Sequence, residues 1–171
     1  MQNVKVDFRV LVSMLARAYS GEFVIAEAVA ECLLYTTDDE VWDSLFVVMH
    51  DCEVHRIMIE EIVKSLGFDI ENFKEYALKT VNVNRFVMDR KKEDVTRLLN
   101  EILRWETGSQ RYYIRVMNFD YSGIVERIGE EAVNKVKNTL ERIIEQKGRN
   151  IKIIEEVFPE MLGTKNIEKL K

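Results

Sequence analysis

The sequence predicts an all-α protein, a four-helix bundle whose two antiparallel helix pairs are joined by one long crossover. The chain of 171 residues contains one proline and seven glycines, so few residues interrupt long helices. Apolar residues recur three and four positions apart over most of its length, as they do on one face of a helix. The connections between these stretches are short, long and short, whereas a plain up-and-down bundle needs three short ones.

The first helix pair is predicted from two long apolar stripes. The first helix spans residues 7–35, and the second spans residues 40–66. Residues 36–39, Thr-Thr-Asp-Asp, form a short connection rich in good N-cap residues. Gly67 follows the second helix and suits the left-handed conformation that often ends a helix. Because the connection is short, the two helices are expected to be antiparallel neighbours.

A long segment separates the two helix pairs. This crossover covers residues 67–91 and is expected to hold one short helix near residues 71–79. When extended, a segment of this length can reach from one end of a bundle to the other. The third long helix is predicted at residues 92–118.

The fourth helix is predicted at residues 124–158, after a short turn. Ser122 is expected to be its N-cap, and Pro159 is expected to end it. Residues 159–171 would then form a C-terminal tail. Residues 1–171 are therefore predicted to form a single domain of ordinary size.

Composition argues against several classes of protein. Hydrophobic residues make up 47% of the chain, enough for a continuous core, and the formal net charge of -5 argues against a nucleic-acid partner. No apolar run is long enough to span a membrane, and the N-terminus does not resemble a signal peptide. Cys32 and Cys52 lie inside apolar helical patterns, which favours core positions and a reducing, cytoplasmic location over a disulfide framework. No nucleotide- or flavin-binding signal is present.

Polar residues interrupt the apolar stripes of three predicted helices. Glu22 lies within the stripe of the first helix, and Glu106 lies within that of the third. Cys52 and His55 are the inward polar positions of the second helix, with His55 near the edge. A buried carboxylate must be paired, hydrogen-bonded, protonated or bound to a metal. The distances to the helix turns place all four residues in one layer near the middle of the bundle.

The fourth predicted helix offers no such group. It has no inward carboxylate near its middle, and it contains no histidine. Glu130, Glu131 and Glu141 are expected to face outward. The short basic run Lys147-Gly148-Arg149 is interpreted as part of a solvated face.

These residues resemble the metal-binding motifs of rubrerythrin-like and other ferritin-like di-iron proteins. That family places one glutamate on each of the first and third helices and Glu-x-x-His on each of the second and fourth. Glu22 and Glu106 are similar to the two single glutamates. Tyr113 is similar to a tyrosine that the family carries about two turns after the ligand glutamate. The resemblance covers most of the chain in architecture.

The two Glu-x-x-His motifs are altered in this sequence. On the second helix, Cys52-Glu53-Val54-His55 takes the place of the motif, with cysteine in place of glutamate. On the fourth helix, the nearest match is Glu131-x-x-Asn134. The resemblance therefore implies four metal ligands: Glu22, Cys52, His55 and Glu106.

The resemblance implies a metal-binding protein with a reduced site. Three or four ligands suit one iron or zinc ion per chain better than two. Open positions on that ion would admit oxygen or peroxide, which implies a relative of the iron-dependent oxidases and peroxidases. Ferritin-like relatives often pair, so a homodimer is expected, with no nucleic-acid or membrane partner.

A second hypothesis is a non-catalytic ferritin-like bundle that has lost its metal site and acts as a binding or oligomerisation module. The absence of ligands on the fourth helix favours it. In that case Tyr113, Ser109 or His55 would partner the two carboxylates in a buried hydrogen-bond network. Cys52 would then be a small core residue instead of a ligand.

Overall fold

The computed structural model describes residues 2–80 and 95–161 of the chain. These residues form helices joined by short connections, and no strand occurs among them. The helices in chain order are α1 (Gln2–Leu33), α2 (Asp39–Ser65), α3 (Ile70–Thr80), α4 (Val95–Met117), α5 (Ser122–Ile128) and α6 (Glu130–Met161). The predicted all-α class is therefore confirmed.

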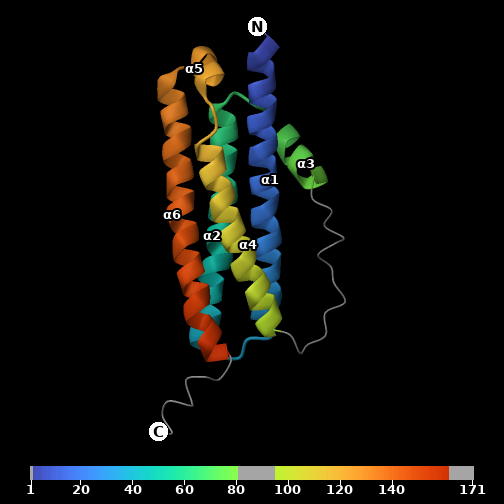
Figure 1. The fold of residues 1–171 in the computed structure, drawn as a ribbon. Helices are drawn as coiled ribbons and strands as arrows, with labels where there is room; N and C mark the ends of the chain where they lie inside the picture. The colour runs from blue at the N-terminus through green and yellow to red at the C-terminus, as the bar shows by residue number, and fades with distance from the viewer. Residues whose placement is uncertain (1, 81–94, 162–171) are drawn as a thin grey trace.

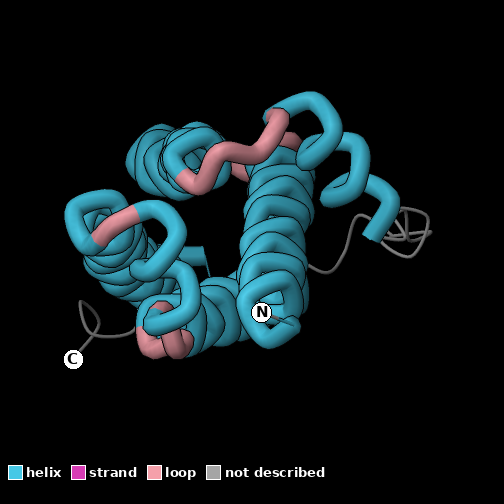
Figure 2. Tube along the Cα trace, turned by 90° about the horizontal axis from the view of Figure 1, so that it is seen from above, coloured by secondary structure: helices cyan, strands magenta, loops and turns pink. Residues whose placement is uncertain are grey.

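The four long helices α1, α2, α4 and α6 lie side by side (Figure 1). In that view, α1 and α6 run downwards along the chain, whereas α2 and α4 run upwards. The main contacts of α1 are with α2 and those of α4 are with α6, while α2 also packs on α6 and α1 on α4. Each long helix thus lies between two antiparallel neighbours, and the view from above shows the helices grouped around a common axis (Figure 2).

The chain returns along the bundle between α2 and α4. Helix α2 ends near the top of Figure 1 and α4 begins near the bottom. Helix α3 forms the first part of this return and packs on α1, where Ser20 Oγ donates a hydrogen bond of 2.6 Å to the carbonyl of Ala77. The short helix predicted near residues 71–79 is confirmed. Residues 81–91 and the predicted start of the third helix at residue 92 lie outside the described residues.

Local hydrogen bonds set the ends of α2 as the sequence predicts. The Asp38 carboxylate accepts hydrogen bonds from the backbone N–H groups of Glu40 at 3.0 Å and Val41 at 3.1 Å, which caps the first turn. Gly67 has a φ of 78°, a left-handed conformation that costs glycine little. The capping prediction at residues 36–39 and the glycine stop at residue 67 are both confirmed.

The single fourth helix predicted at residues 124–158 is wrong, because Gly129 divides it into α5 and α6. Gly129 has φ 87° and ψ 159°, a backbone region that is essentially restricted to glycine. Its N–H donates to the carbonyl of Val125 at 2.9 Å and so closes α5. The chain then changes direction before α6 begins.

The predicted ends of that helix are also wrong. Ser122 is the first residue of α5 and not its N-cap, since its backbone N–H donates to the Asp120 carboxylate at 3.0 Å. Helix α6 continues through Pro159 to Met161. A proline in the last turn removes only one backbone hydrogen bond, so it does not have to end the helix at its own position. Residues 162–171 of the predicted tail lie outside the described residues.

A polar layer divides the core into two apolar clusters. One cluster includes Leu15, Ile59 and Ile143, and the other includes Val29 and Ile102. The buried polar residues of the described part are Ser20, Glu22, His55, Glu106, Lys147 and Asn150. Most of them lie between the clusters, and this layer is the unusual feature of the bundle.

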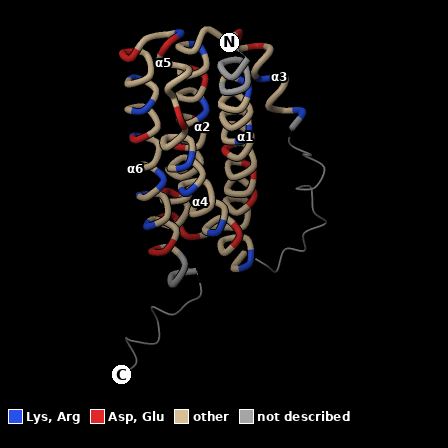
Figure 3. The backbone as a smooth tube through the Cα atoms, turned by 45° about the horizontal axis from the view of Figure 1, so that its top comes forward, with Lys and Arg blue, Asp and Glu red and all other residues tan. Residues whose placement is uncertain are grey.

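The remaining charges are spread over the outside of the bundle. Figure 3 shows basic and acidic residues interspersed along the long helices. No helix within residues 2–80 and 95–161 is long and apolar enough to cross a membrane. Cys32 and Cys52 are both buried and free, as the sequence predicts for core positions.

Candidate functional site

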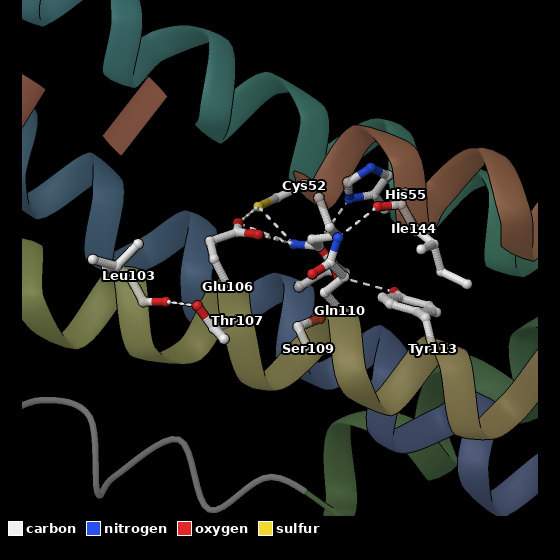
Figure 4. A network of polar contacts seen from close by, with 11 residues as sticks. Cys52, His55, Leu103, Glu106, Thr107, Ser109, Gln110, Tyr113 and Ile144 are labelled. Atoms are coloured by element: carbon white, nitrogen blue, oxygen red, sulfur yellow. Dashed lines mark hydrogen bonds and ion pairs between the residues drawn. The ribbon is translucent and has the colours of Figure 1, made fainter. Parts of the chain in front are cut away.

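Five buried side chains from four helices meet in the middle of the bundle. They are Glu22 from α1, Cys52 and His55 from α2, Glu106 from α4 and Lys147 from α6, and together they form the central cluster. Each is 0% exposed. Figure 4 shows Cys52, His55 and Glu106 pointing toward one another between the helices. All four long helices of the bundle therefore contribute to one enclosed site.

The amino group of Lys147 lies at the centre of this cluster. Its Nζ atom is 2.7 Å from Glu22 Oε2 and 3.0 Å from both carboxylate oxygens of Glu106. The same atom is 3.9 Å from Cys52 Sγ. One ammonium group thus bridges the two carboxylates that the sequence places in the core.

The sequence-based interpretation of Lys147 as a solvated residue is wrong. Its position continues the apolar stripe of α6, because it lies four residues after the buried Ile143 and is followed at helical spacing by the buried Asn150 and Ile154. That periodicity was a usable signal, and it was missed because lysine is rarely buried without a charged partner. The partners here are carboxylates on two other helices.

Glu22 is the more strongly stabilised carboxylate. Besides Lys147, it interacts with His55 Nδ1 at 3.1 Å, and it accepts hydrogen bonds from Tyr113 Oη at 2.9 Å and Ser109 Oγ at 3.2 Å. Burial raises the pKa of this carboxyl, but the Lys147 ammonium and the His55 contact outweigh that effect and lower the pKa to about 2. Glu22 is therefore an ionised carboxylate at neutral pH.

Glu106 has fewer partners. It contacts Lys147, and the Cys52 thiol donates to its Oε1 over 3.7 Å. Burial raises the pKa of Glu106, the negative charge of Glu22 adds to that rise, and Lys147 offsets it only in part. The two carboxyl groups therefore differ, because the pKa of Glu22 is lowered and that of Glu106 is raised.

Cys52, Tyr113 and Lys147 keep their protons at neutral pH. Burial raises the pKa of the Cys52 thiol and of the Tyr113 phenol well above their usual values. Burial alone would lower the pKa of Lys147, but the carboxylates of Glu22 and Glu106 raise it further than burial lowers it. Lys147 is thus an ammonium ion, and its closest counter-ion is Glu22.

A second contact between α4 and α6 lies beside the cluster. Gln110 Nε2 donates a hydrogen bond of 3.1 Å to the backbone carbonyl of Ile144 (Figure 4). A Cβ atom at Gly148 would lie 3.1 Å from that same nitrogen, so the glycine leaves room for the contact. This hydrogen bond helps to fix the register of α4 against α6 within one turn of Lys147.

Some polar atoms at this depth have no hydrogen bond among the described residues. They include His55 Nε2, Glu106 Oε2 and both side-chain polar atoms of Asn150. A buried polar group without a partner costs about 1–3 kcal/mol of stability.

The structure brings together the four ligands that the family resemblance implies, but it adds a lysine between them. Glu131 and Asn134, the nearest match to the fourth-helix motif, are exposed on α6 and do not reach the cluster. Within residues 2–80 and 95–161, no group of three or more His, Cys, Asp or Glu side chains is arranged to hold a metal ion. The hydrogen bonds from Tyr113, Ser109 and His55 to Glu22 are those of the predicted buried network.

Comparison with known proteins gives no family for this chain. No family model, no curated protein and no solved structure matches it. The resemblance to ferritin-like proteins therefore stays a prediction from motifs and connectivity, and function must be argued from the bundle and its central cluster.

Replacing Lys147 with methionine is expected to destabilise the protein strongly. The substitution keeps most of the side-chain volume but leaves two carboxylates buried without a cation, and breaking a buried ion pair in this way costs about 3–5 kcal/mol. Urea denaturation followed by circular dichroism measures this loss in the free energy of unfolding. Lys152→Met, an exposed position on the same helix, is the control and should change stability by less than about 0.5 kcal/mol.

The stability of the bundle should depend on Glu22 in acid. Its pKa is lowered from 4.5 to about 2 in the folded chain, so its stabilising effect is complete above about pH 4.5 and is lost as the pH falls toward 2. Between these values the free energy of unfolding should fall more steeply in the parent than in Glu22→Gln, by up to about 1.4 kcal/mol per pH unit. Glu27→Gln, at an exposed position of α1, should keep the parent slope. Equal slopes in the parent and Glu22→Gln would contradict this assignment.

Proposed function

We propose that this chain is a non-catalytic, ferritin-like bundle that acts as a homodimeric binding module. In this proposal the ammonium group of Lys147 takes the place of a metal ion between the buried carboxylates. The observation that carries the proposal is the position of Lys147 Nζ, which is within 3.0 Å of oxygen atoms from both Glu22 and Glu106. A fixed internal cation gives the cluster a structural role.

The connectivity of the described helices supports the ferritin-like part of the proposal. Helices α2 and α4 run in the same direction, so a long return must join two antiparallel pairs, α1 with α2 and α4 with α6. Ferritin-like bundles have one such crossover. Glu22 on the first long helix and Glu106 on the third are similar to the two single glutamates of that family, as the resemblance implies.

The donor set of the cluster does not fit a resident metal ion. A metal would need carboxylate oxygens at about 2.0–2.2 Å, and Lys147 already holds those oxygens at hydrogen-bond distance. A second cation in the same enclosure would be repelled by the ammonium. Iron-dependent oxidation of a substrate by this site therefore stays a prediction, and the geometry favours the non-catalytic alternative.

The outer face of α2 supports the homodimer. Trp42, Phe46 and Ile57 are exposed, and their spacing of four and eleven residues places them on the same side of the helix. The rings of Trp42 and Phe46 stack at a centroid distance of 5.2 Å with an interplanar angle of 11°. Exposed aromatic residues of this kind are enriched in protein interfaces. The proposal therefore places the homodimer contact on this face of α2.

Removing the internal cation should open a metal site. Lys147→Ala takes away the ammonium and leaves space among the oxygen, nitrogen and sulfur donors of the cluster, so the variant should bind about one Co²⁺ per chain. Equilibrium dialysis against Co²⁺, with absorption spectroscopy of the bound ion, measures this gain. The parent and Lys152→Ala should bind no stoichiometric Co²⁺, and adding Glu22→Gln to Lys147→Ala should remove the site again.

Two results would overturn this account of the cluster. One is stoichiometric Co²⁺ binding by the parent, because the ammonium would then not exclude a metal. The other is a folded Lys147→Ala protein that binds no Co²⁺. If Lys147→Ala does not fold alone, it is refolded with Co²⁺ or with Mg²⁺, and the account requires recovery with Co²⁺ only.

A charge placed on the outer face of α2 should separate the homodimer. The parent chain has a mass of 20.1 kDa and is expected to elute at twice that mass in size-exclusion chromatography with light scattering. Phe46→Glu should elute at the mass of one chain, since it places a carboxylate where the aromatic contact would form. Ile114→Glu, at an exposed apolar position of α4, should leave the homodimer intact. A monomeric parent would contradict the homodimer.

A further inference from the structure

A surface groove formed mainly by α1 is independent of the central cluster. It has a volume of about 320 Å³ and is lined by Arg9, Val10, Ser13, Met14, Arg17 and Tyr112. All but Tyr112 come from α1, and Tyr112 comes from α4. Arg9, Ser13 and Arg17 are spaced four residues apart, so they follow one another along a single face of the helix.

The groove is positively charged in a chain that is acidic overall. The formal net charge of the chain is -5, yet no acidic residue lines the groove among the residues whose side chains the structure describes, 8–79 and 95–157. Among the side chains of residues 8–79 and 95–157, neither Arg9 nor Arg17 forms an ion pair with a carboxylate, in contrast to Arg56, which pairs with Glu53 at 2.8 Å. Two guanidinium groups are therefore available to a ligand.

A third positive charge acts on the same place. Burial raises the pKa of the Tyr112 phenol, and the nearby guanidinium groups of Arg17 and Arg115 act in the opposite direction. Arg115 therefore lies close enough to Tyr112 for its charge to affect the pKa of the phenol. The end of the groove at α4 is thus flanked by two arginines on different helices.

The groove also offers hydroxyl groups and an apolar wall. Ser13 Oγ accepts a hydrogen bond of 3.5 Å from Tyr76 Oη, which leaves the proton of Ser13 free to be donated to a ligand. The Tyr112 hydroxyl is a second donor. Val10 and Met14 provide apolar surface between the charged groups.

We propose that this groove binds a small organic phosphate that has an apolar part. Arginine presents a planar fork of N–H donors that matches the oxygens of a phosphate, and hydroxyl donors complete the contacts. The apolar part of the ligand lies against Val10 and Met14. The size of the groove, about 320 Å³, suits a small molecule of this kind.

The proposal is tested with phenyl phosphate as the probe and the full-length chain labelled with ¹⁵N. Titration followed by two-dimensional ¹H–¹⁵N NMR should give saturable shifts that include the amides of residues 9–17 and of Tyr112. The double variant Arg9→Gln/Arg17→Gln should weaken binding at least about 10-fold, since both charged contacts are lost. Arg104→Gln/Arg142→Gln removes the same charge from exposed positions elsewhere and should bind as the parent does.

Inorganic phosphate tests the role of the apolar wall, and benzoate tests the preference for a phosphate group over a carboxylate. Weaker binding of inorganic phosphate than of phenyl phosphate, at the same amides, supports a role for the apolar wall. Binding of benzoate as tight as that of phenyl phosphate would overturn the choice of phosphate. No saturable shift at about 10 mM phenyl phosphate, or equal loss of affinity in the two double variants, would overturn the site itself.

Discussion

The ion pairs of Lys147 with two buried carboxylates constrain the rest of this bundle. The ammonium on α6 must reach Glu22 on α1 and Glu106 on α4 at once. A shift of any of the three helices by one turn, 5.4 Å along its axis, would separate the charges inside an apolar core. The cluster therefore fixes helix register in a way that apolar contacts alone do not.

This constraint explains why the core is split into two apolar clusters. The apolar faces of the long helices form one cluster on each side of the polar layer. The layer therefore interrupts the apolar face of every long helix at the same depth. Glu22 takes most of the hydrogen bonds, and Glu106 takes few. The two carboxyl groups share one cation, and the one with more hydrogen-bond donors, Glu22, has the lower pKa.

Much of this arrangement could be predicted from the sequence. The stripes of α1, α2 and α4 correctly identified Glu22, Cys52, His55 and Glu106 as inward groups at a common depth, since an isolated polar residue in a regular apolar pattern is conspicuous. Lys147 was not identified, because lysine is usually a surface residue and its partners lie on other helices, far away in the sequence. Gly129 was missed for a similar reason: the pattern of α5 and α6 is nearly continuous, and only the backbone angles show the break. Whether the carboxylates hold a metal ion, as the resemblance implies, depends on which cation lies between them. That cation comes from another helix, so the apolar pattern of a single helix cannot predict it.

The metal content of the purified parent protein tests the role of Lys147 most directly. The protein is produced in cells supplied with iron and zinc, purified without chelator, and measured by elemental analysis against its chain concentration. If Lys147 neutralises the carboxylates, the protein contains far less than one iron or zinc per chain and remains fully folded. About one iron or zinc per chain, lost on Glu22→Ala, would show that the cluster holds a metal ion and that Lys147 does not take its place.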